Sequence, residues 1–176
     1  MKTLQLYILL VSTLGLTMFQ NQTIDQNRSE VNFKINNLLI NTVDGTFKNM
    51  TGTFNFNPED LENSNFNICI DAATIDTDND KRDEHLRSAD FFNVEKYPEI
   101  CFTSTAIEKK DNAYITTGNL SMHGVTKTVQ IPFEFSNNTF KGHFELERMD
   151  YNIGEDTGTF MVGSTAKITI TCVVTP

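Results

Sequence analysis

Hydrophobic residues recur at every second position along most of the chain from residue 29 onward. Val31, Phe33 and Ile35 alternate with polar residues in the first such run. Later runs with the same alternation lie at residues 54–56, 66–70, 100–106, 129–135, 140–146 and 168–174. A period of two puts successive side chains on opposite faces of a strand, so each run predicts a β-strand with one dry and one wet face, as in antiparallel sheets.

Turn signals separate these runs and limit the number of strands. Asn57-Pro58, His123-Gly124 and Asn137-Asn138 are examples, and such pairs favour tight turns. Together with weaker runs near residues 39–47 and 113–122, the pattern predicts eight or nine antiparallel strands. An eight-stranded antiparallel β-barrel is the most economical arrangement, because closure removes both exposed edges of the sheet. A sandwich of two sheets is the alternative architecture.

One segment, residues 75–98, lacks the period of two and has helical character. Residues 78–80 can cap the start of a short helix, and Arg87 lies near its end, where a cation is favourable. Phe91 and Phe92 are among its main apolar residues. Long excursions inside an antiparallel sheet are commonly functional. We therefore expect an all-β fold with one short helical excursion that acts as a lid.

Composition narrows the classes of function. The chain has 14 basic and 23 acidic side chains, a net charge of −9. This balance argues against sequence-independent binding to nucleic acid and against docking on anionic lipid headgroups, because both need clustered Lys and Arg. The 14 Phe and the absence of Trp predict either a very apolar packed core or an enclosed apolar ligand.

The first twenty residues have the features of a secretory signal peptide. Lys2 gives a positive start, and residues 6–16 form an apolar run, which is the usual order in such signals. The run is shorter than the roughly 20 residues that a membrane span needs. An uncleaved anchor and a buried first helix are the alternatives. We expect residues 1–20 to be removed on export and residues 29–175 to form one β-barrel domain, in the periplasm or outside the cell.

The three cysteines, Cys69, Cys101 and Cys172, are too few and too scattered for a disulfide scaffold. None lies in a C-x-x-C pair, so zinc-knuckle and thioredoxin-type sites are not expected. Export permits a disulfide, and Cys69 and Cys101 share one strand-face parity. The sequence favours three free thiols, with a disulfide between Cys69 and Cys101 as the alternative.

An acidic stretch in the helical segment mimics the opening of a calcium-binding loop. Asp76, Asp78 and Asp80 occupy the first three alternate positions of an EF-hand. The sixth position is then Lys81, where Gly is needed, and the twelfth is Arg87, where a bidentate Glu is needed. We therefore interpret this stretch as a capped helix with a solvated acidic face, and we expect no metal site.

No residue set in the sequence predicts catalysis. His85, His123 and His143 have no ligand-like spacing. Ser121 and Ser164 lack the context of a nucleophile elbow. We expect neither an enzyme nor a cofactor.

Two long segments, IDTDNDKRDEHLRSADFFNVEKYPEICFTST and GNLSMHGVTKTVQIPFEF, closely resemble the YceI family of exported lipid- or polyisoprenoid-binding proteins. The opening SEVNFKINNLLINTVDGTFKNMTGTFNFNPEDL and the late ERMDYNIG also resemble family segments in matching order, so the likeness covers about residues 29–174. The resemblance implies a lipocalin-like antiparallel β-barrel that holds a long apolar ligand, commonly an isoprenoid, in its interior.

We therefore expect an exported carrier that sequesters a long-chain apolar amphiphile, an isoprenoid or another lipid. The dry strand faces and the lid supply the expected ligand contacts, which are Phe33, Phe47, Phe54, Phe66, Ile68, Ile70, Phe91, Phe92, Phe102, Phe133, Phe135 and Phe144. Arg82, His85 and Arg87 are candidates for binding an anionic headgroup, with neighbouring carboxylates as their alternative partners. The alternative function is a structural or protein-interaction module whose barrel is solid. No nucleic-acid partner is expected, and transient membrane contact and homo-oligomer formation are left open.

Overall fold

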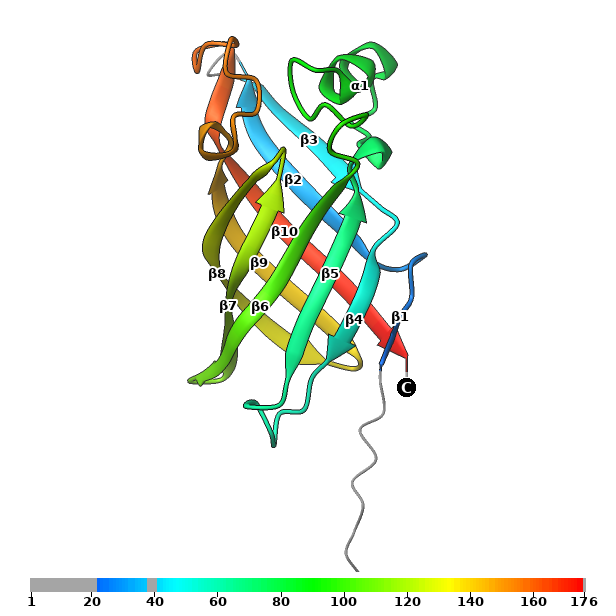
Figure 1. Ribbon diagram of the computed structural model, residues 1–176, viewed down its shortest axis with the longest axis vertical. Helices are drawn as coiled ribbons and strands as arrows, with labels where there is room; N and C mark the ends of the chain where they lie inside the picture. Colours follow the sequence, from blue (N-terminus) through cyan, green and yellow to red (C-terminus); the bar gives the residue numbers. More distant parts are fainter. Residues whose placement is uncertain (1–21, 38–40, 176) are drawn as a thin grey trace, which may run out of the picture.

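The computed structural model describes residues 22–37 and 41–175 as a curled antiparallel sheet with one α-helix at one end (Figure 1). Residues 1–20, the expected signal peptide, lie outside the described residues. The strands are β1 (Thr23–Ile24), β2 (Glu30–Asn37), β3 (Asn41–Phe47), β4 (Thr51–Asn55), β5 (Asn65–Asp71), β6 (Glu99–Lys110), β7 (Ala113–Met122), β8 (Val125–Ser136), β9 (Thr139–Glu147) and β10 (Val162–Thr175). The helices are η1 (Ala72–Thr74), α1 (Asp80–Arg87) and η2 (Arg148–Tyr151).

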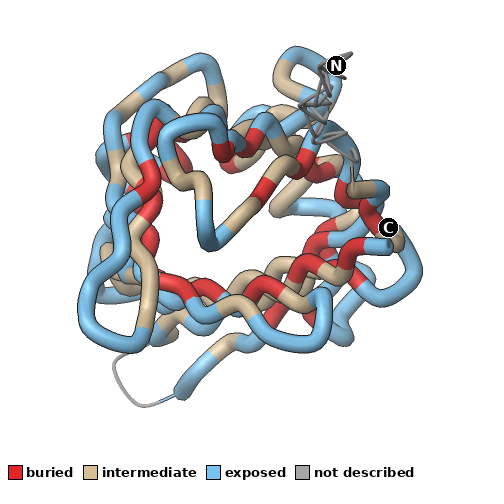
Figure 2. The backbone as a smooth tube through the Cα atoms, turned by 90° about the horizontal axis from the view of Figure 1, so that it is seen from below, coloured by how far each residue is buried: buried red, intermediate tan, exposed pale blue. Residues whose placement is uncertain are grey.

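The strands follow one path around a single interior, in the order β3-β2-β10-β9-β8-β7-β6-β5-β4. Every pairing between neighbours is antiparallel. Seen along the barrel, the buried residues lie on a ring of strands (Figure 2). The predicted antiparallel barrel is thus confirmed, with ten described strands where eight or nine were expected. The pattern missed β1 because a two-residue strand shows no periodicity.

Two isolated bridges, one at each end of the barrel, cover the edge strands β3 and β4 of this path. At the α1 end, Thr46 and Asp76 exchange two backbone hydrogen bonds of 2.9 and 3.0 Å. At the opposite end, Gln22 forms a bridge with Phe54 on β4. These segments cover the unpaired backbone groups that an exposed edge strand would present to other chains.

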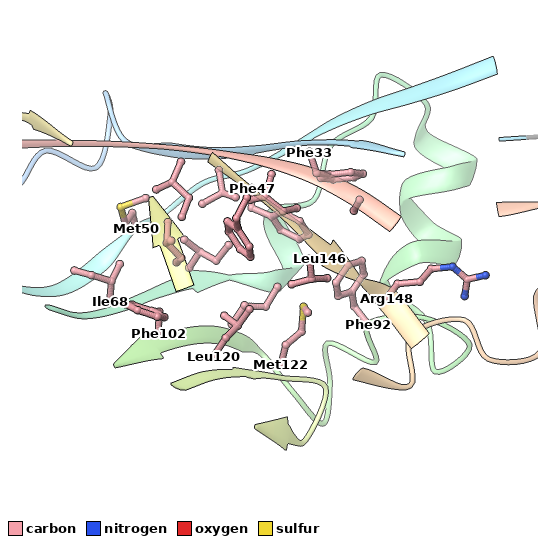
Figure 3. Close-up of a pocket in the computed structure, with 18 of the residues that line it drawn as sticks. Phe33, Phe47, Met50, Ile68, Phe92, Phe102, Leu120, Met122, Leu146 and Arg148 are labelled. Carbon is pink, nitrogen blue, oxygen red and sulfur yellow. The ribbon is translucent and has the colours of Figure 1, made fainter. Parts of the chain in front are cut away.

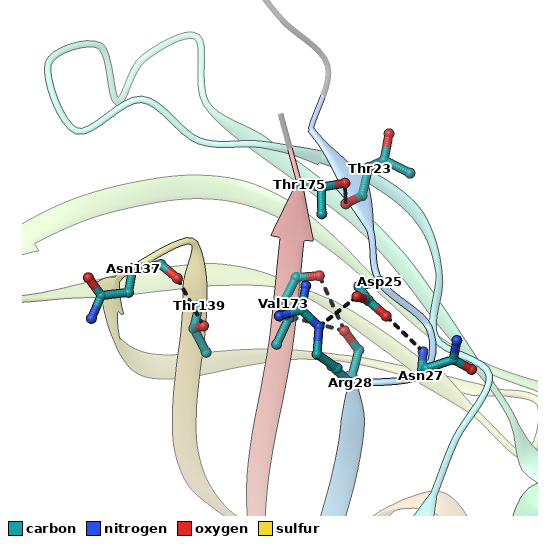
Figure 4. A network of polar contacts seen from close by, with 9 residues as sticks. Thr23, Asp25, Asn27, Arg28, Asn137, Thr139, Val173 and Thr175 are labelled. Carbon is teal, nitrogen blue, oxygen red and sulfur yellow. Dashed lines mark hydrogen bonds and ion pairs between the residues drawn. The ribbon is translucent and has the colours of Figure 1, made fainter.

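Strand β1 is fixed against the end of β10 by a small polar network (Figure 4). The Asp25 amide donates to the carbonyl of Val173 at 2.8 Å, and Arg28 Nε donates to the Asp25 carboxylate at 2.6 Å. The Thr175 hydroxyl donates to the carbonyl of Thr23 at 3.3 Å. This network lies at the end of the barrel opposite α1, where the chain enters the described fold (Figure 1).

Helix α1 confirms the predicted helical excursion. Its N-cap is Asn79, whose side chain accepts from the Arg82 amide at 3.0 Å. Asp83 is buried and accepts hydrogen bonds from both the amide and the hydroxyl of Thr77. A helix N-terminus favours such capping oxygens and acidic side chains. No helix in the described part of the chain is long and apolar enough to cross a membrane.

Aromatic side chains fill the end of the barrel opposite α1. We call this cluster the aromatic plug, and its members are Phe54, Phe56, Phe66, Tyr114, Phe133, Phe135 and Phe140. Phe133 and Phe140 stack with their centroids 4.4 Å apart, and Phe54 stacks on Phe66 at 4.6 Å. Offset-stacked and edge-to-face rings at such distances are the favoured geometries. The residues come from the end of β4 and the residue after it, from the starts of β5, β7 and β9 and from the end of β8, so one layer of the interior is solid.

A disulfide joins Cys69 on β5 to Cys101 on β6, so the expectation of three free thiols is wrong for these two residues. The two cysteines are direct partners in the strand register, with Cα atoms 4.1 Å apart. The alternation of the sequence correctly placed both cysteines on the same face of their strands, but it does not predict which strands are neighbours. Closing a 32-residue separation stabilises the fold mainly by restricting the unfolded chain. Cys172 is a free, buried thiol.

Thiol titration tests this arrangement. We expect no reactive thiol in the native protein, because Cys172 is only 3% exposed, and one thiol per chain after denaturation without a reductant. Reduction in denaturant should raise the number to three, the total in the sequence. Three thiols in the denatured, unreduced protein would contradict the disulfide.

Candidate functional site

An apolar cavity of about 190 Å³ occupies the interior between the aromatic plug and the lid (Figure 3). The lid is the segment of residues 75–98 that contains α1. Almost every side chain that lines the cavity is apolar. Among the described lining residues, the exceptions are Thr116, Arg148 and Cys172. The Thr116 hydroxyl donates to the carbonyl of Ala106 at 3.3 Å, and burial raises the pKa of Cys172 to about 12. The wall therefore has little with which to bind a polar ligand.

Most of the predicted contact residues line this cavity. They are Phe33, Phe47, Phe54, Phe66, Ile68, Ile70, Phe91, Phe92, Phe102 and Phe144. Phe133 and Phe135 also point inward, but they pack inside the aromatic plug and are not among the lining residues. Parity decides which face of a strand is inward, whereas position along the barrel decides whether an inward side chain meets the cavity or the plug.

The aromatic plug forms the floor of the cavity. Phe54, Phe66 and Phe140 belong to the plug and also line the cavity. Their partners on the other side, including Phe56 and Phe133, are buried. A ligand chain can therefore extend from the floor only toward the α1 end.

The lid closes part of that end with three apolar side chains. Leu86 lies on α1, and Phe91 and Phe92 follow it; all three line the cavity. Phe92 meets the ring of Phe47 edge-to-face at 5.3 Å. Phe91 packs so closely on Gly154, which has a φ of +62°, that a Cβ there would lie 2.6 Å from its ring. The lid thus touches the loop that precedes β10.

The candidate headgroup residues do not line the cavity. Arg82 donates to the hydroxyl and the carbonyl of Thr77 at 2.7 and 2.6 Å. Arg87 donates to the carbonyls of Ala73 and Ile75 at 2.8 and 2.7 Å. These bonds tie α1 to the segment before it, so both arginines have a role in holding the lid.

His85 is exposed on the lid and has local partners. Its Nε2 lies 3.2 Å from Asp90, and its ring meets Phe91 at 5.0 Å. The structure therefore connects His85 to the outer side of a cavity-lining residue and not to the cavity itself.

Arg148 was not among the residues expected from the sequence, yet it is the one charged side chain among the described lining residues. It is only 4% exposed, and it has no partner among the ion pairs of the described residues. Burial lowers the pKa of its guanidinium below the ordinary value. A signal was present in the sequence, because Arg148, which directly follows β9, continues the alternation of Phe144 and Leu146. The alternation that puts those two inside therefore predicts Arg148 inside as well.

Backbone carbonyls satisfy the guanidinium of Arg148. Nε donates to Gly163 at 2.9 Å, Nη1 donates to Ile153 and Gly154 at 2.7 Å each, and Nη2 donates to Thr157 and Val162 at 2.8 and 3.0 Å. These five bonds match the five N–H donors of an arginine. Arg148 therefore gathers the loop between η2 and β10 around itself at the α1 end of the cavity (Figure 3).

The site offers little for chemistry. Burial raises the pKa of Tyr151 to about 12, and nearby Asp150 adds to the effect, so this phenol stays neutral at ordinary pH. One group of possible metal ligands occurs in the described part of the chain, Cys69 with Glu99 and Cys101, but its two sulfurs form the disulfide. The arrangement is suited to enclosing an apolar molecule.

The plug and the cavity wall should respond differently to truncation. Phe133→Ala removes a fully packed ring and should lower the free energy of unfolding by about 3–5 kcal/mol. Phe144→Ala, the matched control, removes a half-buried ring that already borders empty space, so its cost should be clearly smaller. Denaturant unfolding of both variants measures the difference. Equal losses would contradict the division of the interior into a solid and a hollow part.

Substitutions of Arg148 should destabilise the loop before β10. Arg148→Met removes five hydrogen bonds to partly or fully buried carbonyls. Each carbonyl left without a donor costs on the order of 1–3 kcal/mol, so a large loss of stability is expected. Arg148→Lys restores the charge and part of the donors, so its loss should be intermediate. Faster hydrogen exchange or proteolysis at residues 152–162 in Arg148→Lys would locate the effect. Unchanged protection of this loop would contradict the assignment.

Comparisons with known proteins agree with this architecture. The model of the YceI-like domain matches residues 22–174. Protein YceI of Salmonella newport (strain SL254) is 36% identical over 138 residues, which cover 73% of this chain and 72% of the relative. The crystal structure of Burkholderia cenocepacia BcnA superposes with a TM-score of 0.79 at 26% identity, covering 87% of this chain and 99% of that chain.

A further solved structure shares the fold at lower identity. It is described as a polyisoprenoid binding domain from Saccharophagus degradans, with a TM-score of 0.67, 15% identity and coverage of 87% of this chain and 97% of that one. The match of the domain model across nearly all of the described residues, together with the identity to the Salmonella protein, carries the assignment. The chain belongs to the YceI family.

Proposed function

We propose that this protein is an exported carrier that sequesters the chain of a long apolar amphiphile, an isoprenoid or another lipid, inside its barrel. The observation that supports this most strongly is the cavity with its hydrocarbon wall between the aromatic plug and the lid. The family and the fold agree with a binding protein. The likeness to the polyisoprenoid binding domain concerns the fold alone, so the proposed ligand class rests on the cavity.

An empty cavity of this kind is costly. Voids in protein cores destabilise by about 24 cal/mol per Å³, so a void of about 190 Å³ would cost about 4–5 kcal/mol. An apolar ligand recovers this cost by restoring the missing contacts. The alternative, a structural module with a solid barrel, is weakened because only the plug end of the interior is solid.

The size of the cavity determines which part of a ligand it holds. A dry apolar cavity of about 150 Å³ accommodates benzene, so about 190 Å³ accepts a short piece of hydrocarbon. A long chain would place its terminal segment on the floor formed by Phe54, Phe66 and Phe140. Its remainder and its polar end would then extend past the lid.

Such a site suits a carrier. Each buried methylene contributes about 0.8 kcal/mol, but a bilayer offers nearly the same burial, and ordering the chain in the protein has its own cost. Net transfer between membrane and barrel is then close to neutral, and the ligand can be released as readily as it is taken up. Export, the other part of the proposal, rests on residues 1–20 of the sequence, and no catalytic residues are proposed.

Native mass spectrometry of the full chain, purified from a bacterial host without detergent, tests the proposal. We expect a co-purifying lipid mass on the wild-type protein. Ala166→Leu adds side-chain volume at a small, buried position of the cavity wall, so it should lower the lipid occupancy or shift it to shorter chains. Lys167→Leu makes an apolar change on the outer, exposed face of the same strand and should leave the lipid profile unchanged.

Two results would contradict the carrier function. One is a wild-type protein that carries no lipid and takes up none from added fatty acids or isoprenols. The other is a lipid profile that Ala166→Leu and Lys167→Leu leave equally unchanged, because the bound lipid would then lie outside the cavity.

A further inference from the structure

The exposed large hydrophobic residues of the described chain gather in one short stretch. They are Met149, Phe160 and Met161, with exposed fractions of 38%, 64% and 51%. Met149 lies on η2, and the other two end the loop of residues 152–161, which we call the rim loop. Single exposed apolar residues are ordinary on protein surfaces, whereas a cluster of them marks an interaction site.

The rim loop stands at the α1 end of the barrel, next to the cavity (Figure 1). Ile153 near its start and Val162, the residue after it, both line the cavity. The exposed Phe160 and Met161 are therefore continuous along the chain with the cavity wall.

The exposure of this pair is built into the fold. Arg148 holds the carbonyls of residues 153, 154, 157 and 162 around one guanidinium. The amides of Met161 and Val162 both donate to the carbonyl of Gly158, at 2.9 and 3.2 Å. The base of the loop is thus fixed, and these bonds hold Phe160 and Met161 in a turn with their side chains outside.

The charges of this stretch point to the kind of partner. Residues 149–161 contain Asp150, Glu155 and Asp156 and no Lys or Arg. Lys127 pairs with Asp150 at 2.7 Å, and both side chains are partly exposed. Anionic lipid headgroups are recognised by clustered cations, so this surface is unsuited to them.

The size of the patch argues against a stable protein partner. A specific protein interface needs about 800 Å² on each side, whereas a whole Phe side chain buries only about 150–250 Å². Two or three side chains are too few for such an interface, but they are enough to dip into the surface of a bilayer.

We propose that the rim loop docks the α1 end of the barrel on a lipid bilayer with neutral headgroups by inserting Phe160 and Met161. The inference rests on the carrier function proposed above, and it adds the surface from which the ligand is taken. Docking in this orientation places the contact between Phe91 and Gly154, where the lid meets the rim loop, at the membrane. A lipid chain then passes from the bilayer to the cavity without crossing water.

The absence of Trp from the sequence allows a local optical test on the full chain. Phe160→Trp puts a single Trp in the rim loop, whose emission is recorded with excitation that the four Tyr do not absorb. Phosphatidylcholine vesicles should shift its emission to shorter wavelengths, and brominated phosphatidylcholine should quench it. Asn112→Trp, an exposed position in the β6–β7 turn at the opposite end, should show neither change. Because each reporter is local, binding through another part of the chain does not mimic the result.

Variants without the apolar side chains test the energetics. Phe160→Ser combined with Met161→Ser should weaken vesicle binding by about ten-fold or more, since burial of one such side chain corresponds to at least that factor. Because both residues are exposed, the fold should persist, and circular dichroism checks this. Binding to phosphatidylcholine should depend little on salt, and added phosphatidylglycerol should not strengthen it.

Three results would overturn the docking proposal. They are an unshifted Phe160→Trp emission with phosphatidylcholine, equal responses from the two Trp reporters, or binding that requires phosphatidylglycerol and weakens with salt. Lipid content by native mass spectrometry separates this failure from failure of the carrier function. A protein that carries lipid but does not dock overturns only the docking, whereas one that docks but never carries lipid overturns only the carrier function.

Discussion

The fold depends on one constraint, that a single sheet must bury its only apolar face against itself. No second sheet and no large helix covers the inner faces of β2 to β10 in the described part of the chain. The sheet meets the constraint by curling until isolated bridges join β3 to Asp76 and β4 to Gln22. The side chains available then determine how much of the enclosed volume is filled. Stacked rings fill the end opposite α1, and the side chains toward α1 leave a cavity.

The hydrogen-bonding groups of Thr116 and Arg148 on the cavity wall are satisfied within the protein, and this determines which ligands the cavity can select. Thr116 and Arg148 give their donors to backbone carbonyls. A wall without free donors or acceptors recognises a ligand by its volume and shape, because an unpaired polar ligand group would lose its hydrogen bonds to water. In the proposed carrier, selection by headgroup would therefore operate outside the apolar wall, at the lid and the rim loop.

The lid and the rim loop form one assembly at the α1 end. Arg87 donates to the carbonyls of Ala73 and Ile75 and so holds the lid, and Arg148 donates to carbonyls of the rim loop and so holds that loop. Phe91 against Gly154 is the contact between the two parts. Hydrogen bonds to rigid backbone fix each part, whereas an apolar contact joins them. Separating the lid from the rim loop would therefore break no hydrogen bond at this contact. In the proposed carrier, a ligand chain would pass at this place.

The sequence by itself determined the elements and the inward faces. The period of two identified the strands, and the break in it located the lid. Parity placed eight of the ten expected strand contacts on the cavity wall, and the lid supplied Phe91 and Phe92. The same alternation, continued by one residue past β9, also predicts that Arg148 points inward. These features are local, because a side chain's face follows from its place in its own strand.

Only the tertiary structure decided what depends on distance along and around the barrel. It paired β5 with β6 and so joined Cys69 to Cys101. It placed Phe133 and Phe135 in the plug, and it gave Arg82 and Arg87 to backbone carbonyls of the lid. The pairing of β5 with β6 and the packing of Phe133 and Phe135 are set by contacts between segments far apart in the sequence. Strand register and the curl of the sheet fix such contacts, and a local pattern of residues does not predict them. The partners of Arg82 and Arg87 are near in sequence, but they depend on how the chain folds back between η1 and α1.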